Sequence, residues 1–213
     1  MVITWYGQSC FKIQSGELSL IIDPFSKEIG LTPPRSRTDI LLVSHSHFDH
    51  SNIDAIPEGY FLIDGPGEYE IKGMAINGFP AFHDNQSGKE LGLTAVYAIE
   101  IEGIKVCHLG DFGEEKISPE LLEKIGEVDI LMIPVGGKFT IGAEAAANAV
   151  SQIDPKIVIP MHYHVAGLKI KLNGVDEFLK ETGAGKKTPQ EKLTIKKKDL
   201  EGKETEVVVL KAA

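Results

Sequence analysis

Four potential metal ligands stand within six residues, directly after a short apolar run. The run at residues 40–43 predicts a buried strand, and the ligands that follow it are His45, His47, Asp49 and His50. A buried strand that stops at a tight turn directs the side chains of that turn toward one point. Three of the seven histidines of the chain lie in this turn, whereas ordinary loops are filled by Ser, Asn and Gly. The pattern therefore indicates a metal site rather than a solvated polar loop.

Length and charge narrow the classes of protein to consider. A chain of 213 residues is long enough for one core, and we expect a single domain over residues 1–213. The net charge of −9 argues against nucleic acid as the partner. Residues 1–7 lack the pattern of a signal peptide, and no stretch approaches the roughly 18 apolar residues of a membrane span. We expect a cytoplasmic protein with a small-molecule substrate and no membrane partner. We also expect Cys10 and Cys107 to be reduced and buried, with a disulfide between them as the alternative.

The order of predicted elements is many strands, then mixed strands and helices. Strands are expected at 2–6, 10–13, 18–22, 60–63, 69–71, 74–77, 93–101, 104–109, 128–135 and 156–159, and helices at 118–125, 142–152 and 175–182. Residues 193–198 and 206–210 predict a terminal strand pair. The Lys- and Glu-rich tail from Gly183 either extends a sheet or mediates self-association, so a homo-oligomer stays an open alternative. This order predicts an α/β (α+β) chain in which helices cover two sheets.

Three later apolar segments also end in a potential ligand, and these ligands are His83, Asp111 and His162. With the first cluster they give five histidines and two carboxylates, which are enough for two divalent ions. Imidazole and carboxylate without thiolate suit Zn²⁺ first, with Mn²⁺ or Fe as alternatives. Two such ions can bridge a water, lower its pKa and use the resulting hydroxide as a nucleophile. This chemistry needs no serine nucleophile, and the sequence has no Gly-x-Ser-x-Gly motif.

The HxHxDH motif, followed in order by His83, Asp111 and His162, resembles the metallo-β-lactamase superfamily over residues 2–164. Around it, Trp5-Tyr6-Gly7-Gln8, Ile22-Asp23-Pro24-Phe25, His108-Leu109-Gly110-Asp111 and Ile159-Pro160-Met161-His162-Tyr163 look like a compact subgroup of predicted metal-dependent hydrolases. L-ascorbate-6-phosphate lactonase is a relative of that subgroup. The resemblance implies a four-layer αββα sandwich with the metal ions at one edge of the two sheets.

The resemblance also implies how the ligands divide between two ions. His45, His47 and His83 would hold the first ion, whereas Asp49, His50 and His162 would hold the second. Asp111 would bridge both ions, and Asp49 would also pass a proton to the leaving group. Related sequences often have a histidine where this chain has Gln8, so the role of that position is open.

Several other residues have two interpretations each. Asp23 is a turn former or a group that orients the ligand turn. His108 is a supporting residue rather than a ligand. Tyr163 and His164 face the substrate, stabilising a developing oxyanion, or are exposed loop residues. Lys138 binds an anionic group at the pocket rim or is an ordinary surface lysine.

These observations predict a binuclear metal-dependent hydrolase of a small ester, lactone or phosphodiester. A nuclease of the same fold is one alternative, although the acidic charge does not favour it. An iron-containing redox protein or a non-catalytic metal-binding protein is another. We expect the substrate to be selected by the loops at 26–37, 84–92 and 136–141, because loop sequences around a fixed scaffold set specificity.

Overall fold

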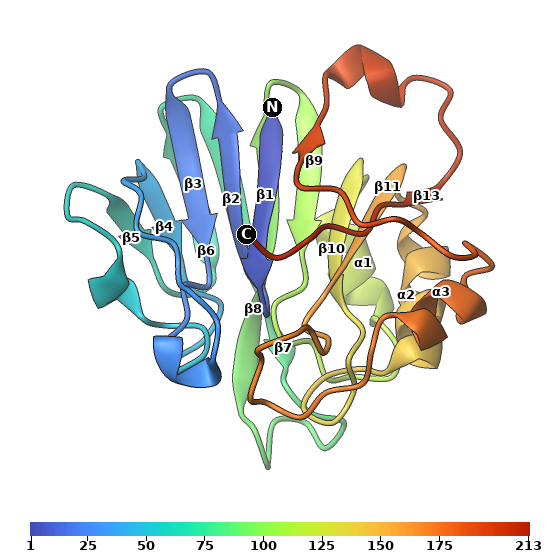
Figure 1. Cartoon of the computed structure of the whole chain (residues 1–213). Helices are drawn as coiled ribbons and strands as arrows, with labels where there is room; N and C mark the ends of the chain where they lie inside the picture. The colour runs from blue at the N-terminus through green and yellow to red at the C-terminus, as the bar shows by residue number, and fades with distance from the viewer.

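Two β-sheets hold all thirteen strands of the computed structural model, which describes residues 1–213 (Figure 1). The first sheet has the order β12-β1-β2-β3-β4-β5, formed by Leu193–Thr194, Val2–Gly7, Cys10–Ser15, Leu18–Ile22, Ile40–Leu42 and Phe61–Ile63. The second has the order β13-β11-β10-β9-β8-β7-β6, formed by Glu206–Val207, Ile157–Met161, Ile130–Pro134, Ile104–His108, Leu93–Ile101, Met74–Phe82 and Gly67–Ile71. Strands β3 to β5 pair parallel, as do β9, β10 and β11. Parallel neighbours end at the same edge of a sheet, so residues that follow them gather there.

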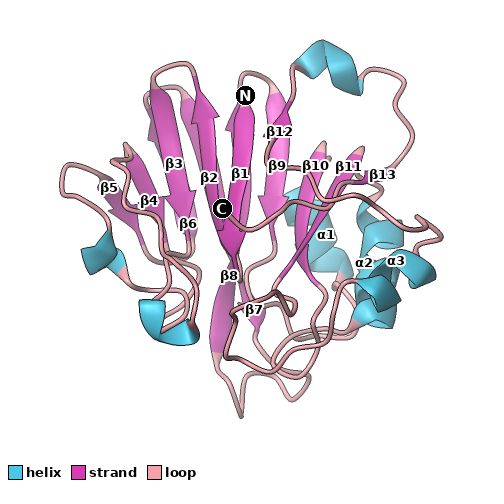
Figure 2. Cartoon of the chain, in the orientation of Figure 1, coloured by secondary structure: helices cyan, strands magenta, loops and turns pink.

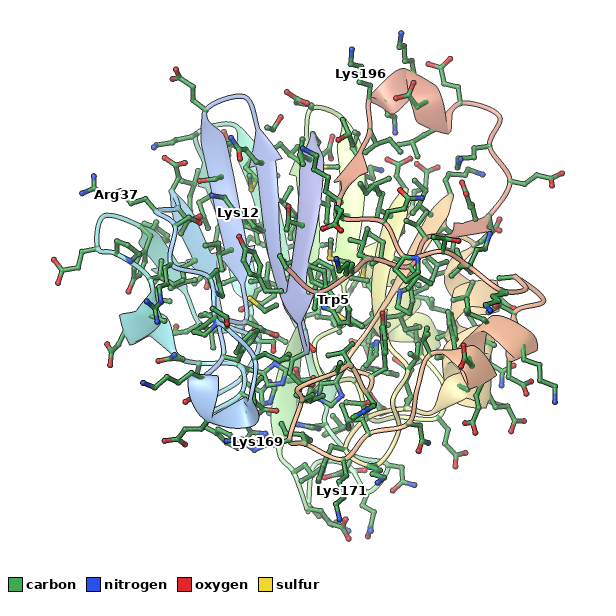
Figure 3. The ribbon with its side chains drawn as sticks, viewed as in Figure 1. Trp5, Lys12, Arg37, Lys169, Lys171 and Lys196 are labelled. Carbon is green, nitrogen blue, oxygen red and sulfur yellow. The ribbon has the colours of Figure 1, made fainter.

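The main core lies between the two sheets. Alternation decides which side chains enter it: Ile3 and Trp5 of β1 are fully buried, while Val2, Thr4 and Tyr6, which alternate with them, are only half-buried. Figure 3 shows Trp5 inside the molecule, whereas Arg37 and Lys196 project outward. In β4 the outer two residues face the main core, and Leu41 faces a second, smaller cluster. A strand buried on both faces explains why residues 40–43 are continuously apolar.

Three α-helices gather beside the second sheet, near β10 and β11 (Figure 2). They are α1 (Pro119–Ile125), α2 (Ala143–Ile153) and α3 (Asp176–Glu181). The hydroxyl of Ser118 accepts a hydrogen bond from the N–H of Leu121 and begins α1, as the Ser-Pro sequence predicts. The outer face of the first sheet is covered by the single turns η1 (Lys27–Ile29) and η2 (Ile53–Ala55) and by residues 165–172. The predicted fold class is confirmed, with a helical layer over the first sheet that is reduced to single turns.

The strand predicted at 74–77 is longer in the structure. β7 continues from Met74 to Phe82, through Pro80. Its pairing with β6 stops at Gly78, while its pairing with β8 runs on to the end. Beyond Gly78 one side of β7 has no neighbour, so a proline without an N–H is tolerated there. This extension carries the chain directly to His83.

The predicted terminal strand pair was wrong. β12 pairs antiparallel with β1 at the edge of the first sheet, and β13 pairs parallel with β11 at the edge of the second. The turn η3 (Lys197–Leu200) and the residues after it separate the two strands, so they do not form a hairpin. Each two-residue strand pairs with an exposed sheet edge, since unpaired N–H and C=O groups there provide ready partners. The tail therefore extends both sheets.

The two cysteines lie in different clusters and are unpaired. Cys10 packs in the small outer cluster, and Cys107 packs in the main core. The alternative of a disulfide between them is therefore absent from the structure. No helix combines the length and the apolar character that crossing a bilayer requires.

Candidate metal centre

Seven polar side chains from four parts of the chain meet at one edge of the two sheets. They are His45, His47, Asp49, His50, His83, Asp111 and His162, and they follow the ends of β4, β7, β9 and β11. Three overlapping groups of these residues each place their potential ligand atoms within 4.8 Å of one another. Residues up to 117 positions apart in the chain, such as His45 and His162, thus contribute to one cluster.

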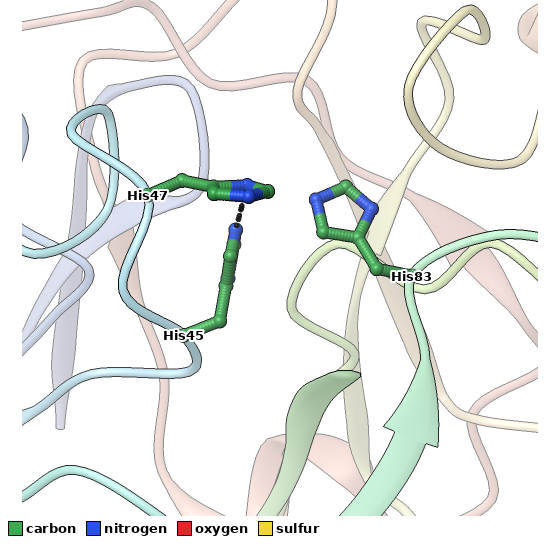
Figure 4. A group of neighbouring side chains, drawn as sticks. All are labelled: His45, His47 and His83. Carbon is green, nitrogen blue, oxygen red and sulfur yellow. Dashed lines mark hydrogen bonds between the residues drawn. The ribbon is translucent and has the colours of Figure 1, made fainter. Parts of the chain in front are cut away.

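The first group consists of His45, His47 and His83 (Figure 4). Nε2 of His45 lies 3.0 Å from Nδ1 of His47. The ring of His83 completes the group, with its centre 4.8 Å from that of His45 and 5.1 Å from that of His47. These are the three histidines that the sequence assigned to one ion, and the structure brings them together.

The second group consists of Asp49, His50 and His162, and Asp111 lies between the two groups. Oδ2 of Asp111 is 3.1 Å from Nε2 of His50, 3.2 Å from Nε2 of His162 and 3.5 Å from Nε2 of His83. One carboxylate oxygen therefore contacts histidines of both groups, as the predicted bridging role requires.

Gly110 explains how the chain can present Asp111. This glycine has a φ of +56°, and a Cβ there would lie 2.5 Å from the hydroxyl oxygen of Thr94. Only a residue without a side chain fits this turn without displacing β8. The Gly-Asp sequence after β9 is thus a local requirement of the site.

Asp23 contacts Ser44 and His50 and fixes the position of the ligand turn. It is fully buried, and one carboxylate oxygen accepts a hydrogen bond from the N–H of Ser44 at 2.7 Å. The other accepts from the hydroxyl of Ser44 at 2.7 Å and lies 3.0 Å from Nδ1 of His50. With Nδ1 of His50 facing a carboxylate, its Nε2 is directed toward the cluster, which is the arrangement of a metal-binding histidine. The structure thus gives Asp23 the orienting position rather than that of a simple turn former.

His108 supports the neighbouring carboxylate and lies outside the ligand groups. Its Nδ1 accepts a hydrogen bond from the N–H of Gly110, so its Nε2 carries the proton and donates to the carbonyl of Ser9 at 2.9 Å. The hydroxyl of Ser9 in turn donates to Oδ1 of Asp111 at 3.1 Å. Burial lowers the pKa of His108, which favours this neutral form.

Gln8, whose role the sequence left open, contacts Asp49. The side chain is fully buried, and its Nε2 donates to Oδ2 of Asp49 at 3.0 Å. The amide has to point this way because an amide oxygen facing the carboxylate would be repelled. The carbonyl of Gln8 also accepts from the backbone N–H of His162, so this residue holds members of the second group in two ways.

We expect Gln8→Leu to lower kcat/KM by about 10- to 100-fold, the loss that follows removal of an outer partner of a metal ligand. Asp49 would lose the N–H that fixes its carboxylate, while the size of the buried side chain would stay similar. Steady-state kinetics with saturating metal measures this effect. Gln14→Leu is the matched control, because Gln14 is exposed and distant from the cluster. Equal activity of both variants would contradict an orienting role for Gln8.

The charge states of three cluster residues suit metal binding directly. Burial lowers the pKa of His45 to about 3, and burial also lowers the pKa of His83, so both are neutral imidazoles with a free lone pair. Burial would raise the pKa of Asp111, but His162 and His50 outweigh it and hold that pKa well below its usual value. Metal ligands have to be neutral histidines and ionised carboxylates, which is the state that His45, His83 and Asp111 adopt. Burial would lower the pKa of His50, but Asp111 and Asp23 outweigh it and raise that pKa well above its usual value, so a metal ion has to displace a proton from His50.

Three buried nitrogen atoms of the cluster have no hydrogen-bond partner, and they are Nε2 of His50, Nδ1 of His83 and Nδ1 of His162. Nε2 of His50 is near Asp111 but makes no hydrogen bond, and no other group satisfies it. A buried nitrogen without a partner is costly unless a ligand occupies the space in front of it. The donor set and these unpartnered nitrogens therefore fit a divalent metal ion.

A pocket of about 300 Å³ opens onto this cluster. It is lined by His47, Phe48, Asp49, His83, Leu91, Asp111, Phe139, His162 and Ile170. The four apolar residues among them are absent from our sequence-based set of site residues. Exposed aromatic residues beside ligands, such as Phe48 inside the HxHxDH motif, are a signal that could have found them.

The predicted substrate contacts lie away from this pocket. Tyr163 is buried, packs against Trp5 with ring centres 4.9 Å apart, and donates its hydroxyl proton to the carbonyl of Leu210. Alternation after β11 turns it toward the core, because its neighbour His162 points into the cluster. His164 is exposed and outside the lining, and so is Lys138, next to the lining residue Phe139.

Comparison with known proteins agrees with this arrangement. Residues 2–162 match the family model of the beta-lactamase superfamily domain, which covers every ligand of the cluster. The chain belongs to the metallo-β-lactamase superfamily. A protein of known structure from Thermotoga maritima, assigned as a zinc-dependent hydrolase of the metallo-β-lactamase superfamily, is 34% identical and covers 99% of both chains with a TM-score of 0.78.

Two relatives of known sequence belong to the UPF0173 metal-dependent hydrolases. The one from Thermococcus onnurineus is 30% identical over 190 residues, covering 76% of this chain and 84% of that protein. The one from Methanosarcina mazei is 33% identical over 195 residues, covering 76% of this chain and 83% of that protein. The predictions of the superfamily, of its fold and of a metal-dependent hydrolase are thereby confirmed.

Proposed function

We propose that this metallo-β-lactamase superfamily hydrolase binds two divalent ions, preferably zinc, and cleaves a small ester, lactone or phosphodiester. The observation that carries the proposal is the position of Asp111 between two groups of three ligands. Four ligands satisfy a zinc ion, so a single ion would leave some of the seven potential ligands without a metal to bind. Two ions would supply an activated water and stabilise the charge that develops on the oxygen of the cleaved bond.

We propose a separate role for each residue of the cluster, as a metal ligand or as a group that transfers a proton. His45, His47 and His83 would hold the first ion, and Asp49, His50 and His162 the second, with Asp111 bridging them. Asp49 lines the pocket, and its Oδ2 is fixed by Gln8. This carboxylate is placed to take a proton from the attacking water and to deliver it to the leaving group. The preferred zinc rests on the donor set, because imidazole and carboxylate without thiolate suit a borderline cation.

The direct test is the metal content of the purified protein together with its activity. We expect two zinc ions per chain by elemental analysis and hydrolysis that a chelator abolishes and added zinc restores. Substrates would be a panel of carboxylic esters, lactones and phosphodiesters. A content well below one ion per chain, or activity that survives chelation, would overturn the proposal; bound iron with oxygen reactivity would favour the redox alternative.

Single substitutions test the division of the ligands. We expect His47→Ala to lose mainly the first ion and His50→Ala mainly the second, because each removes one donor from a different group. Calorimetric titration of the metal-free variants with zinc separates the two binding events. His164→Ala is the control, since this exposed histidine lies outside the pocket and is expected to leave both events unchanged. Equal loss of both ions in each variant would contradict the division.

A further inference from the structure

The wall of the metal pocket is apolar on every side that the ligands do not occupy. Phe48, Leu91, Phe139 and Ile170 complete the lining around five of the metal-site residues. Phe48 and Phe139 are 58% and 47% exposed, which is unusual for phenylalanine in a folded protein. Large apolar side chains gathered at the mouth of a pocket mark a binding surface.

These four side chains come from four separate segments that are each held in place. Phe48 belongs to the ligand turn itself. The loop that carries Leu91 is tied to Asp84, whose carboxylate accepts the N–H groups of Gln86, Gly88, Glu90 and Leu91 at 2.8–2.9 Å. The N–H of Phe139 bonds to the carbonyl of Gly137, and the N–H of Lys169, beside Ile170, bonds to the carbonyl of Ile29. The wall is therefore preformed.

The lining contains no lysine and no arginine. Lys138, Lys169 and Lys171 are next to lining residues in sequence, but they are exposed and none of them belongs to the lining. Within the lining, a phosphate or carboxylate group on the substrate would therefore find positive charge only at the metal ions. Sites that select such groups ordinarily add arginine or lysine, which this wall omits.

The geometry points to an uncharged substrate whose apolar chain lies on Phe48, Leu91, Phe139 and Ile170, namely a small carboxylic ester or lactone rather than a phosphodiester. This inference rests on the proposed hydrolytic function and names its substrate class. The volume of about 300 Å³ suits a small molecule. Water would add across the ester C–O bond, giving a carboxylic acid and an alcohol, so no oxidant or further reactant is needed.

The test uses zinc-loaded protein and p-nitrophenyl esters of acetate, butyrate and hexanoate, with bis(p-nitrophenyl) phosphate as the anionic counterpart. We expect kcat/KM to rise by roughly twofold to fourfold per added methylene group, the gain that burial of a methylene provides. The kcat/KM for each neutral ester should also be higher than the kcat/KM for the phosphodiester. Phe139→Ala should flatten the dependence on chain length. Phe61→Ala is the matched control, because Phe61 is 52% exposed on β5, outside the pocket, and should keep the dependence.

A second measurement needs no turnover. Calorimetric titration of zinc-loaded protein with aliphatic hydroxamic acids of increasing length should show affinity that rises with length in the wild type and less steeply in Phe139→Ala. Chelator-sensitive hydrolysis with no dependence on chain length, or with preference for the phosphodiester, would overturn the inference and leave the proposed function standing. If nothing is hydrolysed, the proposed function fails, and affinity that does not rise with chain length would then overturn the inference as well.

Discussion

Asp111→Asn is expected to cost the largest share of activity, more than the roughly 100-fold that loss of an outer partner can cost. The carboxylate contacts His50, His162 and His83 through a single oxygen. Asparagine keeps the shape of the side chain but removes its negative charge, so both groups of ligands would lose their shared anion. We therefore expect weaker binding of both ions rather than of one.

Thermal unfolding with and without zinc measures this effect independently of any substrate. A ligand at about 100 times its dissociation constant stabilises the native state by about 2.7 kcal/mol. Zinc should therefore raise the midpoint temperature of unfolding of the wild type. The same addition of zinc should raise the midpoint temperature of Asp111→Asn only slightly. Asp64→Asn, at an exposed position, serves as the control. A variant that keeps the full gain would contradict the bridging position of Asp111.

Asp23→Asn is expected to destabilise the fold and the metal site together. The carboxylate is fully buried and serves both Ser44 and His50. Breaking a buried charged pair costs about 3–5 kcal/mol, because the remaining partner stays desolvated. Asparagine also tolerates the φ of +49° at this position, so the effect would reflect charge rather than backbone strain.

Denaturant unfolding of the metal-free protein gives the loss of stability, and zinc titration gives the loss of affinity, expected at about 10- to 100-fold. Asp54→Asn is the matched control, since Asp54 is an exposed residue of η2 with no ion pair. A variant as stable as the wild type would show that Asp23 only shapes the turn.

The metal cluster was predictable because its signal is local. Each ligand stands where an apolar strand stops, and carboxyl ends of parallel strands gather at one edge without any detailed knowledge of packing. Hence residues as distant as His45 and His162 could be assigned to one site. The inner strands of both sheets were predictable for the same reason, since alternation and Gly-containing turns mark them directly.

The pocket wall and the tail depend on contacts that leave little local signal. Phe139 and Ile170 lie in loops, and loop sequence alone does not predict that their side chains line the pocket. Tyr163 was predicted to contact the substrate, but its ring packs against Trp5. Residues 193–194 and 206–207 pair with strands far away in the chain, so only the assembled sheets reveal their partners. Edge pairing of such short segments is decided by the whole fold rather than by propensity.

The pairing of β12 with β1 has a consequence for the order in which the molecule assembles. Val2 lies opposite Thr194, and the N–H of Ala213 bonds to the carbonyl of Trp5, so this edge of the first sheet closes only when residues far apart in the chain meet. Until then, one edge of the first sheet stays open to pairing with other chains. All seven metal-site residues precede this closing segment in the chain, so none of them belongs to the residues that close the edge. Contacts of such long sequence separation slow folding, so we expect the closing of this edge to be a late step.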